Sequence, residues 1–261
     1  MKITRCLASV FVLVLVLAHT ASAHYTFIMP EKFHVSPGET IKLGFHSADT
    51  FPDSTALAKR LTDATLHAGG KAVPISLSED GKRMVGVATV TNNGYVIATV
   101  VNAASIENMK AESFTKYLKE EGLNHIVDAR AERGETDKPA RERYTMWAKT
   151  LVLAGTSNDG YKTAIGLPIE ILPEKDPAAL KSGEPLPVRI LFQGAPAKNL
   201  EVMATSATEK SHSVGKTDTD GRILVTVAPG PWRLHTILME RSSKEDADWE
   251  SFWATLTFEA Q

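Results

Sequence analysis

Alternating apolar and polar positions are the dominant pattern in the first hundred residues. In the run 40–46 (TIKLGFH), the residues Ile41, Leu43 and Phe45 fall on one face, which is the two-residue period of a half-buried β-strand. Turn residues separate such runs, and Asn92-Asn93-Gly94 predicts a hairpin. Further runs of this kind are 24–30, 64–68, 84–91 and 95–101. This part of the chain is therefore expected to form antiparallel β-structure.

A stretch of strong helix formers interrupts the strands between about 105 and 140. Its apolar residues recur at helical spacing. Gly122 is expected to divide the stretch into two helices, and Gly134 is expected to end the second. The following run, 144–154 (YTMWAKTLVLA), fits a strand or a helix, and we favour a strand.

Prolines between 168 and 187 mark the expected boundary between two domains, and alternation resumes after them. The expected strands of this second half are 188–192, 200–205, 223–227, 232–239 and 252–259. Short strands at this spacing are typical of a sandwich. The sequence thus predicts a mainly β protein with two antiparallel, Ig-like β-sandwich domains. These are 24–172, which carries the helical insertion at about 105–140, and 173–261.

The first 23 residues read as a cleaved secretory signal peptide. Lys2 and Arg5 precede the apolar run 10–17, and Ala21-Ser22-Ala23 resembles a cleavage site. The apolar run is too short to span a membrane, so no membrane insertion is expected after cleavage. Cys6 is the single cysteine, and the mature chain would therefore contain no disulfide, thiol nucleophile or cysteine-ligated zinc. These features favour a bacterial periplasmic location.

Composition and charge exclude several classes of function. The chain is 43% hydrophobic and 23% charged, with a formal charge of −2, so no electrostatic footprint for nucleic acid is present. Motifs for a serine elbow, a phosphate loop, a dinucleotide site or an H-E-x-x-H zinc site are absent from the sequence. Asp246, Asp248 and Glu250 form a small acidic group, which we interpret as a solvated loop rather than a cation site.

His24 is the most informative histidine, because the predicted cleavage makes it the first residue. A free α-amine and an imidazole on one residue can chelate one metal ion, and nitrogen donors suit copper(II) and nickel(II). His235 lies in a predicted strand and is interpreted as structural. His67 has no partner that the sequence identifies.

A second ligand follows from strand pairing. If 25–29 and 41–45 form an antiparallel hairpin that buries their larger apolar side chains, the same register places His24 opposite His46, with both toward solvent. Opposed Cβ atoms lie about 5 Å apart, which lets two imidazoles share one ion. His34 on the connecting loop is a rival partner. A histidine at a strand end is also commonly an exposed surface residue, and that interpretation stays open.

The order of these features resembles a bacterial family of exported proteins, the domain-of-unknown-function family 4198, whose members were once labelled nickel-transport-like. The segments that carry the resemblance are AHYTFIMP, SPGETIKLGF, YLKEEGLNHIVDARAERGETDKPARERY, GLPIEILPEKDPAALKSGEPLPVRILFQGAP, TDTDGR, GPWRLHTILMER and ADWESFWATLTFE. The resemblance implies two β-sandwich modules, the second transthyretin-like or carboxypeptidase-regulatory-like. It implies a histidine after the signal peptide, which His24 matches, and a Gly-His near the end of the second strand, where this chain has Gly44-Phe45-His46.

The leading hypothesis is a periplasmic protein that binds copper or nickel for metal handling or uptake, with His24 and His46 as ligands and no assigned catalytic residue. Such a protein would serve a metal-uptake or membrane transport partner. One alternative is a non-catalytic adhesion or ligand-binding sandwich. Another is a metal-dependent oxidase, which would need an open coordination position beside a substrate surface.

Overall fold

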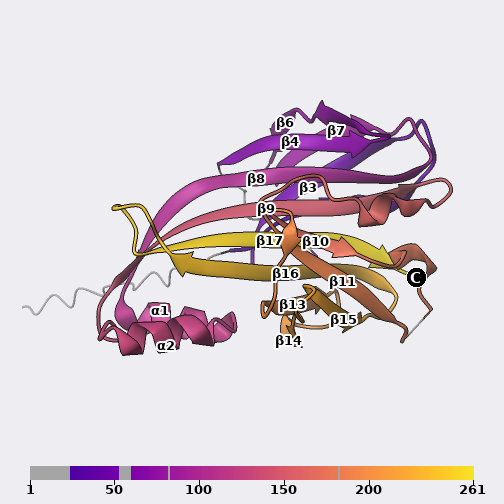
Figure 1. Ribbon diagram of the computed structural model, residues 1–261. Helices are drawn as coiled ribbons and strands as arrows, with labels where there is room; N and C mark the ends of the chain where they lie inside the picture. The colour runs from indigo at the N-terminus through magenta and orange to yellow at the C-terminus, as the bar shows by residue number, and fades with distance from the viewer. Residues whose placement is uncertain (1–23, 53–59, 82, 182) are drawn as a thin grey trace, which may run out of the picture.

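The computed structural model describes residues 24–52, 60–81, 83–181 and 183–261 (Figure 1). The predicted signal peptide lies outside these residues. Within them the chain forms three β-sheets and one pair of α-helices. No helix in the described ranges is long and apolar enough to cross a membrane.

A large sheet runs through the middle of the molecule and contains the four longest strands (Figure 1). Its strands, in spatial order, are β14 (His212–Lys216), β13 (Glu201–Ser206), β16 (Gly230–Arg241), β17 (Trp249–Ala260), β9 (Ala140–Ala154), β8 (Gly94–Met109), β4 (Leu61–Ala68) and β5 (Lys71–Pro74), with β2 (His34–Val35) paired to β9. Most pairs are antiparallel, but β17 and β2 both run parallel to β9.

Two smaller sheets cover this large sheet. The N-terminal sheet has the order β1 (Thr26–Pro30), β3 (Thr40–Ser47), β7 (Arg83–Thr89) and β6 (Leu77–Asp80). The C-terminal sheet contains β10 (Ile169–Pro173), β11 (Pro185–Phe192), β12 (Ala195–Pro196) and β15 (Arg222–Thr226). The 3-10 turns η1 (Asp159–Lys162) and η2 (Pro177–Ala179) lie between β9 and β11.

The helices α1 (Ala111–Glu120) and α2 (Asn124–Glu132) lie side by side at one end of the large sheet (Figure 1). Gly122 separates them with a positive φ of 69°, and Gly134 follows α2 with a φ of 63°. Both glycines adopt the left-handed conformation that commonly ends a helix. The division and the end of the helical stretch are therefore confirmed.

Three apolar clusters hold these layers together. Ile28 and Leu43 of the N-terminal sheet pack with Val152 of the large sheet. Ile171 of the C-terminal sheet packs with Leu256. A third cluster lies under the helices and is formed by residues such as Phe114, Leu118, Met146 and Trp253. The mainly β sandwich with a helical insertion is confirmed in this arrangement.

The two halves of the chain share the large sheet. Residues 249–257 of β17 pair with 142–150 of β9, so the sheet is continuous across the proposed boundary. The division at residues 172 and 173 stays a prediction.

Two local predictions were wrong. Asn92-Asn93-Gly94 does not close a hairpin, because β7 pairs with β3 and β6 whereas β8 pairs with β4 and β9. The helical stretch begins later than 105, since β8 continues to Met109 in register with Ala140. Tertiary pairing outweighs local propensity here. The strand favoured for 144–154 is confirmed as part of β9.

Candidate functional site

The hairpin between β1 and β3 is confirmed, but its predicted register is wrong. Phe27 lies opposite His46, so the pairing is shifted by three positions from the one that placed His24 there. Relative to β3, this odd shift turns the side chains of β1 to the other face, so Phe27 shares the face of His46 and covers it. His46 is therefore buried, 6% exposed, and its ring stacks on Phe27 at 4.9 Å between centroids. The expectation that His46 faces solvent beside His24 fails.

The physical reason is that β1 is buried on both faces. Ile28 packs into the core between the N-terminal and large sheets, while Phe27 contacts Phe51 and Arg233 on the other side. Thr255 and Thr257 of β17 donate hydroxyl hydrogen bonds to the carbonyl groups of β1 at residues 26 and 28. A strand that is buried on both faces has no alternation of apolar and polar residues, so its sequence does not fix its register.

His24 lies at the start of the described chain, with its side chain 51% exposed. Its Nδ1 is 3.2 Å from Oδ2 of Asp49, which follows β3. His34 lies elsewhere, with Nε2 3.4 Å from Oε2 of Glu259. His34 and His46 line the same cavity of about 570 Å³. In the described ranges, no three His, Cys, Asp or Glu side chains are grouped as a metal site.

A buried polar cluster begins at Tyr25, the residue that follows His24. The hydroxyl of Tyr25 donates to Glu121 at the end of α1, and Nε2 of His235 is 3.2 Å from the other carboxylate oxygen of Glu121. The rings of Tyr25 and His235 are 4.2 Å apart. Burial lowers the pKa of His235, so the ring is neutral in the fold and its Nε2–H donates to Glu121. The interpretation of His235 as a buried structural residue agrees with this position.

Arg233 supports the loop that carries Asp49. Its guanidinium is fully buried and lies over the rings of Tyr25 and Phe27. It donates to the carbonyl oxygens of Ala48 at 3.4 Å and Asp49 at 3.5 Å. Burial lowers the pKa of Arg233 to about 10, so the side chain remains charged at neutral pH. Sequence reasoning missed this residue, because it lies 184 positions from Asp49 and no local motif connects them.

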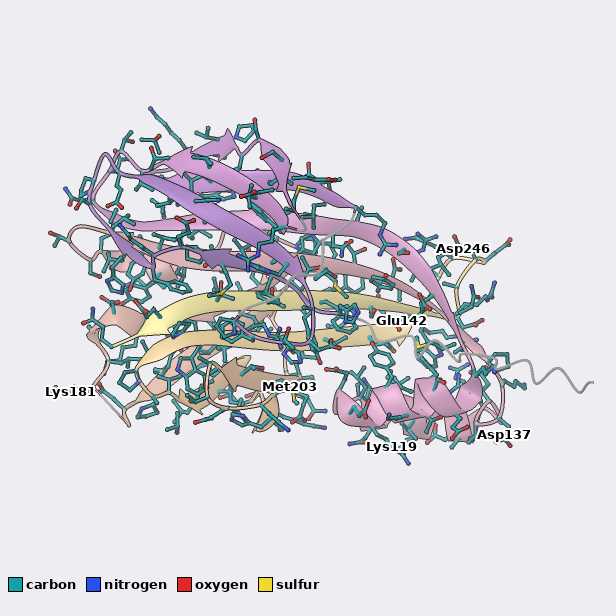
Figure 2. All side chains as sticks on the ribbon, turned by 180° about the vertical axis from the view of Figure 1, so that it is seen from behind. Lys119, Asp137, Glu142, Lys181, Met203 and Asp246 are labelled. Atoms are coloured by element: carbon teal, nitrogen blue, oxygen red, sulfur yellow. The ribbon has the colours of Figure 1, made fainter. Side chains whose placement is uncertain are left out.

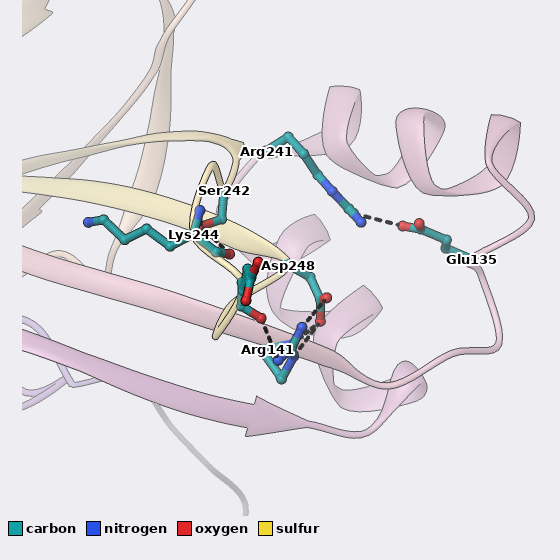
Figure 3. Close-up of polar contacts among 7 residues, drawn as sticks. Glu135, Arg141, Arg241, Ser242, Lys244 and Asp248 are labelled. Atoms are coloured by element: carbon teal, nitrogen blue, oxygen red, sulfur yellow. Dashed lines mark hydrogen bonds and ion pairs between the residues drawn. The ribbon is translucent and has the colours of Figure 1, made fainter.

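The acidic group at the start of β17 is neutralised by neighbouring basic side chains, and Figure 3 shows the contact between Arg141 and Asp248. Asp248 accepts from Arg141 at 3.0 Å, Asp246 pairs with Arg143, and Glu250 lies 2.8 Å from Lys244. Arg241 also reaches Glu135 beyond α2 and ties the helical pair to β16 (Figure 3). These contacts favour a structural role for the acidic group.

A second buried carboxyl group, Glu142, lies where α1 meets the large sheet (Figure 2). Tyr117 of α1 donates to it at 3.0 Å, and Ser251 of β17 also donates. Trp253 Nε1 donates to the Ser251 hydroxyl at 2.9 Å. Glu107 of β8 lies opposite Glu142 in the pairing of β8 with β9. Burial raises the pKa of Glu142 to about 7 and outweighs the hydrogen bonds, which lower it.

This carboxyl group predicts a pH-dependent stability. A pKa raised above the unfolded value of 4.5 means that the folded state retains a proton that the unfolded state loses. The contribution of Glu142 to the stability of the fold is then fully present below about pH 4.5, and it is lost as the pH rises through about 7. Compared with Glu142→Gln, the wild type should lose up to about 3 kcal/mol of unfolding free energy between about pH 5 and pH 8. Urea unfolding at the two pH values measures this, and an equal difference at both would contradict it.

The fold and these sites define a β-sandwich protein with a buried polar cluster under its first strand. Residues 21–240 match the family described as "Domain of unknown function (DUF4198)", and the chain belongs to that family. No curated protein matches the chain.

Among the solved structures similar to this chain is one that comprises three N-terminal domains of the highly immunogenic outer capsid protein (Hoc) of bacteriophage RB49. The identity is 12%, over 90% of this chain and 59% of that chain, so this chain spans about three fifths of its length. At a TM-score of 0.21, the similarity supports no conclusion.

Proposed function

We propose that the exported mature chain binds one copper or nickel ion through its first residue, His24, for metal handling or uptake in the periplasm. The observation that carries this proposal is the 3.2 Å approach of His24 Nδ1 to Asp49 Oδ2. Metal–nitrogen and metal–oxygen bonds are each about 2.0–2.2 Å long, so two adjacent ligands of one ion lie roughly 3 Å apart. The observed spacing suits such a pair as well as it suits a hydrogen bond.

The donor set is consistent with these metals. After cleavage before His24, the α-amine and Nδ1 of this residue would form a chelate, and the Asp49 carboxylate would supply a third donor. Two nitrogens and one oxygen are suitable for copper(II) or nickel(II). His46 remains a candidate ligand from the sequence, although its burial against Phe27 leaves Asp49 as the nearer partner.

Exposure of the site favours transfer of the ion to another protein. About half of each side chain, His24 and Asp49, is open to solvent. Because the site lies at the surface, a metal-uptake or membrane transport partner could approach the ion directly. Arg233 beneath the loop would hold Asp49 in position without touching the ion.

His24→Ala is expected to weaken copper(II) or nickel(II) binding by more than about tenfold, because the imidazole donor is lost. Placing one alanine before His24 should have a similar effect, since it converts the chelating amine into an amide. Asp49→Asn should weaken binding less than His24→Ala does, because the amide oxygen can still reach the ion but carries no negative charge. Binding should also weaken as the pH falls, because metal ligands bind in their deprotonated form and protons compete with the ion for them.

The measurement is calorimetric titration of the protein purified from the periplasm, with its first residue established by mass spectrometry. His212→Ala is the matched control, because His212 is another exposed histidine, near Lys210 and Glu209. His46→Ala tests the remaining candidate. Equal affinity in the wild type, His24→Ala and the alanine-extended chain would exclude this site.

A further inference from the structure

The cavity of about 570 Å³ lies on the outer face of the N-terminal sheet, which is turned away from the core. Leu43 and Phe45 of β3 pack into that core, so the alternate residues Gly44 and His46 face outward. Met29 of β1 lies opposite Gly44 in the strand pairing, and opposed side chains share a face. Met29, Gly44 and His46 all line the cavity.

Gly44 leaves a notch in this face, and the ring of His46 lies over the notch. A Cβ atom at position 44 would be 2.7 Å from Nε2 of His46 and 3.5 Å from the carbonyl oxygen of Met29. Stacking on Phe27, at 4.9 Å between ring centroids, holds the imidazole in this orientation. The missing side chain at Gly44 therefore lets an imidazole nitrogen reach the space that Met29 also lines.

An imidazole nitrogen and a thioether sulfur together favour copper(I), because soft sulfur ligands select that ion. Metal–nitrogen bonds are about 2.0 Å long and metal–sulfur bonds about 2.3 Å, so two donors of one ion lie roughly 4 Å apart. Met29 and His46 are diagonal neighbours across β1 and β3. Such residues lie about 7–8 Å apart, which aromatic and long side chains can span, and the unbranched methionine adapts readily to a given distance.

The hard oxygen donors of the cavity already face basic groups. Asp80 and Glu31 lie 3.0 Å and 3.9 Å from the ammonium group of Lys42. Glu259 lies 3.4 Å from Nε2 of His34. A divalent ion that prefers oxygen ligands would have to displace these partners, whereas copper(I) does not need the carboxylates.

Apolar residues form much of the remaining lining, and they are Phe33, Val85, Pro30, Pro52 and Pro231. Apolar surroundings disfavour a doubly charged ion more than a singly charged one, because the cost of desolvation rises with charge. The hydrophobic shell of a metal site controls its redox preference for the same reason. This cavity therefore favours the reduced ion.

We propose that Met29 and His46 bind one copper(I) ion in this cavity, the Met29 cavity. The site goes beyond the function proposed above, since it uses neither the α-amine of His24 nor Asp49 and takes the reduced ion. The register that separates His46 from His24 is the one that places His46 over Gly44 beside Met29. A chain with both sites would hold copper in either oxidation state.

The experiment titrates copper(I) into the full mature protein carrying His24→Ala, under anaerobic and reducing conditions, with bicinchoninate as the competing chelator. This background keeps the outcome independent of the site at His24. One copper(I) ion should bind. Met29→Leu removes the sulfur at nearly constant volume, and His46→Gln removes the imidazole. Each should weaken copper(I) binding by more than about tenfold.

Gly44→Ala tests the geometry without removing a ligand, because its Cβ atom would displace Nε2 of His46. It should also weaken copper(I) binding, while urea unfolding shows that the variant remains folded. Met203→Leu is the matched control, since Met203 lies on β13 opposite His235 and away from the cavity. Its copper(I) affinity should equal that of the His24→Ala background.

Silver(I), a redox-inert ion of the same charge, gives a direct readout of the sulfur ligand. In the NMR spectrum of the methionine methyl groups, it should shift the signal of Met29 and leave that of Met203 in place. The proposal is overturned if no copper(I) is retained against the chelator, or if Met29→Leu or His46→Gln binds as tightly as the background. A folded Gly44→Ala chain with undiminished affinity, or a silver(I) shift that is absent from Met29, would also overturn it.

Discussion

Replacing Glu170 with alanine is expected to lower the free energy of unfolding by about 3–5 kcal/mol, because it leaves a buried charge unpaired. Lys149 and Glu170 are each 2% exposed, and their charged atoms are 3.5 Å apart. Glu170 also accepts backbone hydrogen bonds from Ile165, Gly166 and Leu167. The substitution would therefore isolate the Lys149 ammonium group and three N–H donors together.

The double variant Lys149→Met with Glu170→Gln distinguishes a charge effect from a shape effect. The pair would become neutral while the glutamine oxygen still accepts from the loop, so most of the lost stability should return. Glu184→Gln is the matched control, because Glu184 pairs with Lys175 at the surface. It should cost far less stability than Glu170→Ala, because an exposed ion pair contributes little. Urea unfolding measures all three, and similar losses at Glu170 and Glu184 would contradict the prediction.

Much of the fold could be predicted from local pattern. The alternation in 40–46 matches β3, and the two glycines that bound α2 follow from the need for a positive φ. Ser105–Met109 shows where this reasoning stops. Its composition favours a helix, but it forms strand because β9 pairs with it. A local window cannot include a partner strand that lies more than thirty residues further on.

The candidate site was less predictable for the same reason. The predicted cleavage site identifies His24 as a candidate from the sequence alone. Asp49, in contrast, is placed beside His24 by the register of β3 and by its contact with Arg233. The register depends on how β1 is buried from both sides, which involves β17 from the far end of the chain. Glu121 is likewise 114 positions from His235. Only the assembled fold brings these groups together.

Glu121→Ala is expected to destabilise the fold by about 2–4 kcal/mol, because it leaves two buried donors without an acceptor. These are the Tyr25 hydroxyl and Nε2–H of His235, which both reach Glu121. Since Tyr25 precedes β1, the loss should also loosen the first strand. Hydrogen exchange at residues 24–30 should become faster than in the wild type, and any metal affinity at His24 should fall with it.

Glu120→Ala is the closest control, since the neighbouring carboxylate is exposed and pairs only with Lys116 across one helical turn, at 3.7 Å, among the described residues. It should cost no more than about 0.5 kcal/mol. The loss of unfolding free energy in Glu121→Gln should lie between those of Glu120→Ala and Glu121→Ala, because the amide oxygen still accepts one of the two hydrogen bonds. Neutral His235 adds a pH dependence: its lowered pKa means that stability is lost as the pH falls below about 6.5, where the unfolded imidazole takes up a proton. If Glu120→Ala and Glu121→Ala were equally stable, the buried cluster would not hold the first strand. The position of Asp49 beside His24 would then depend on Arg233 alone.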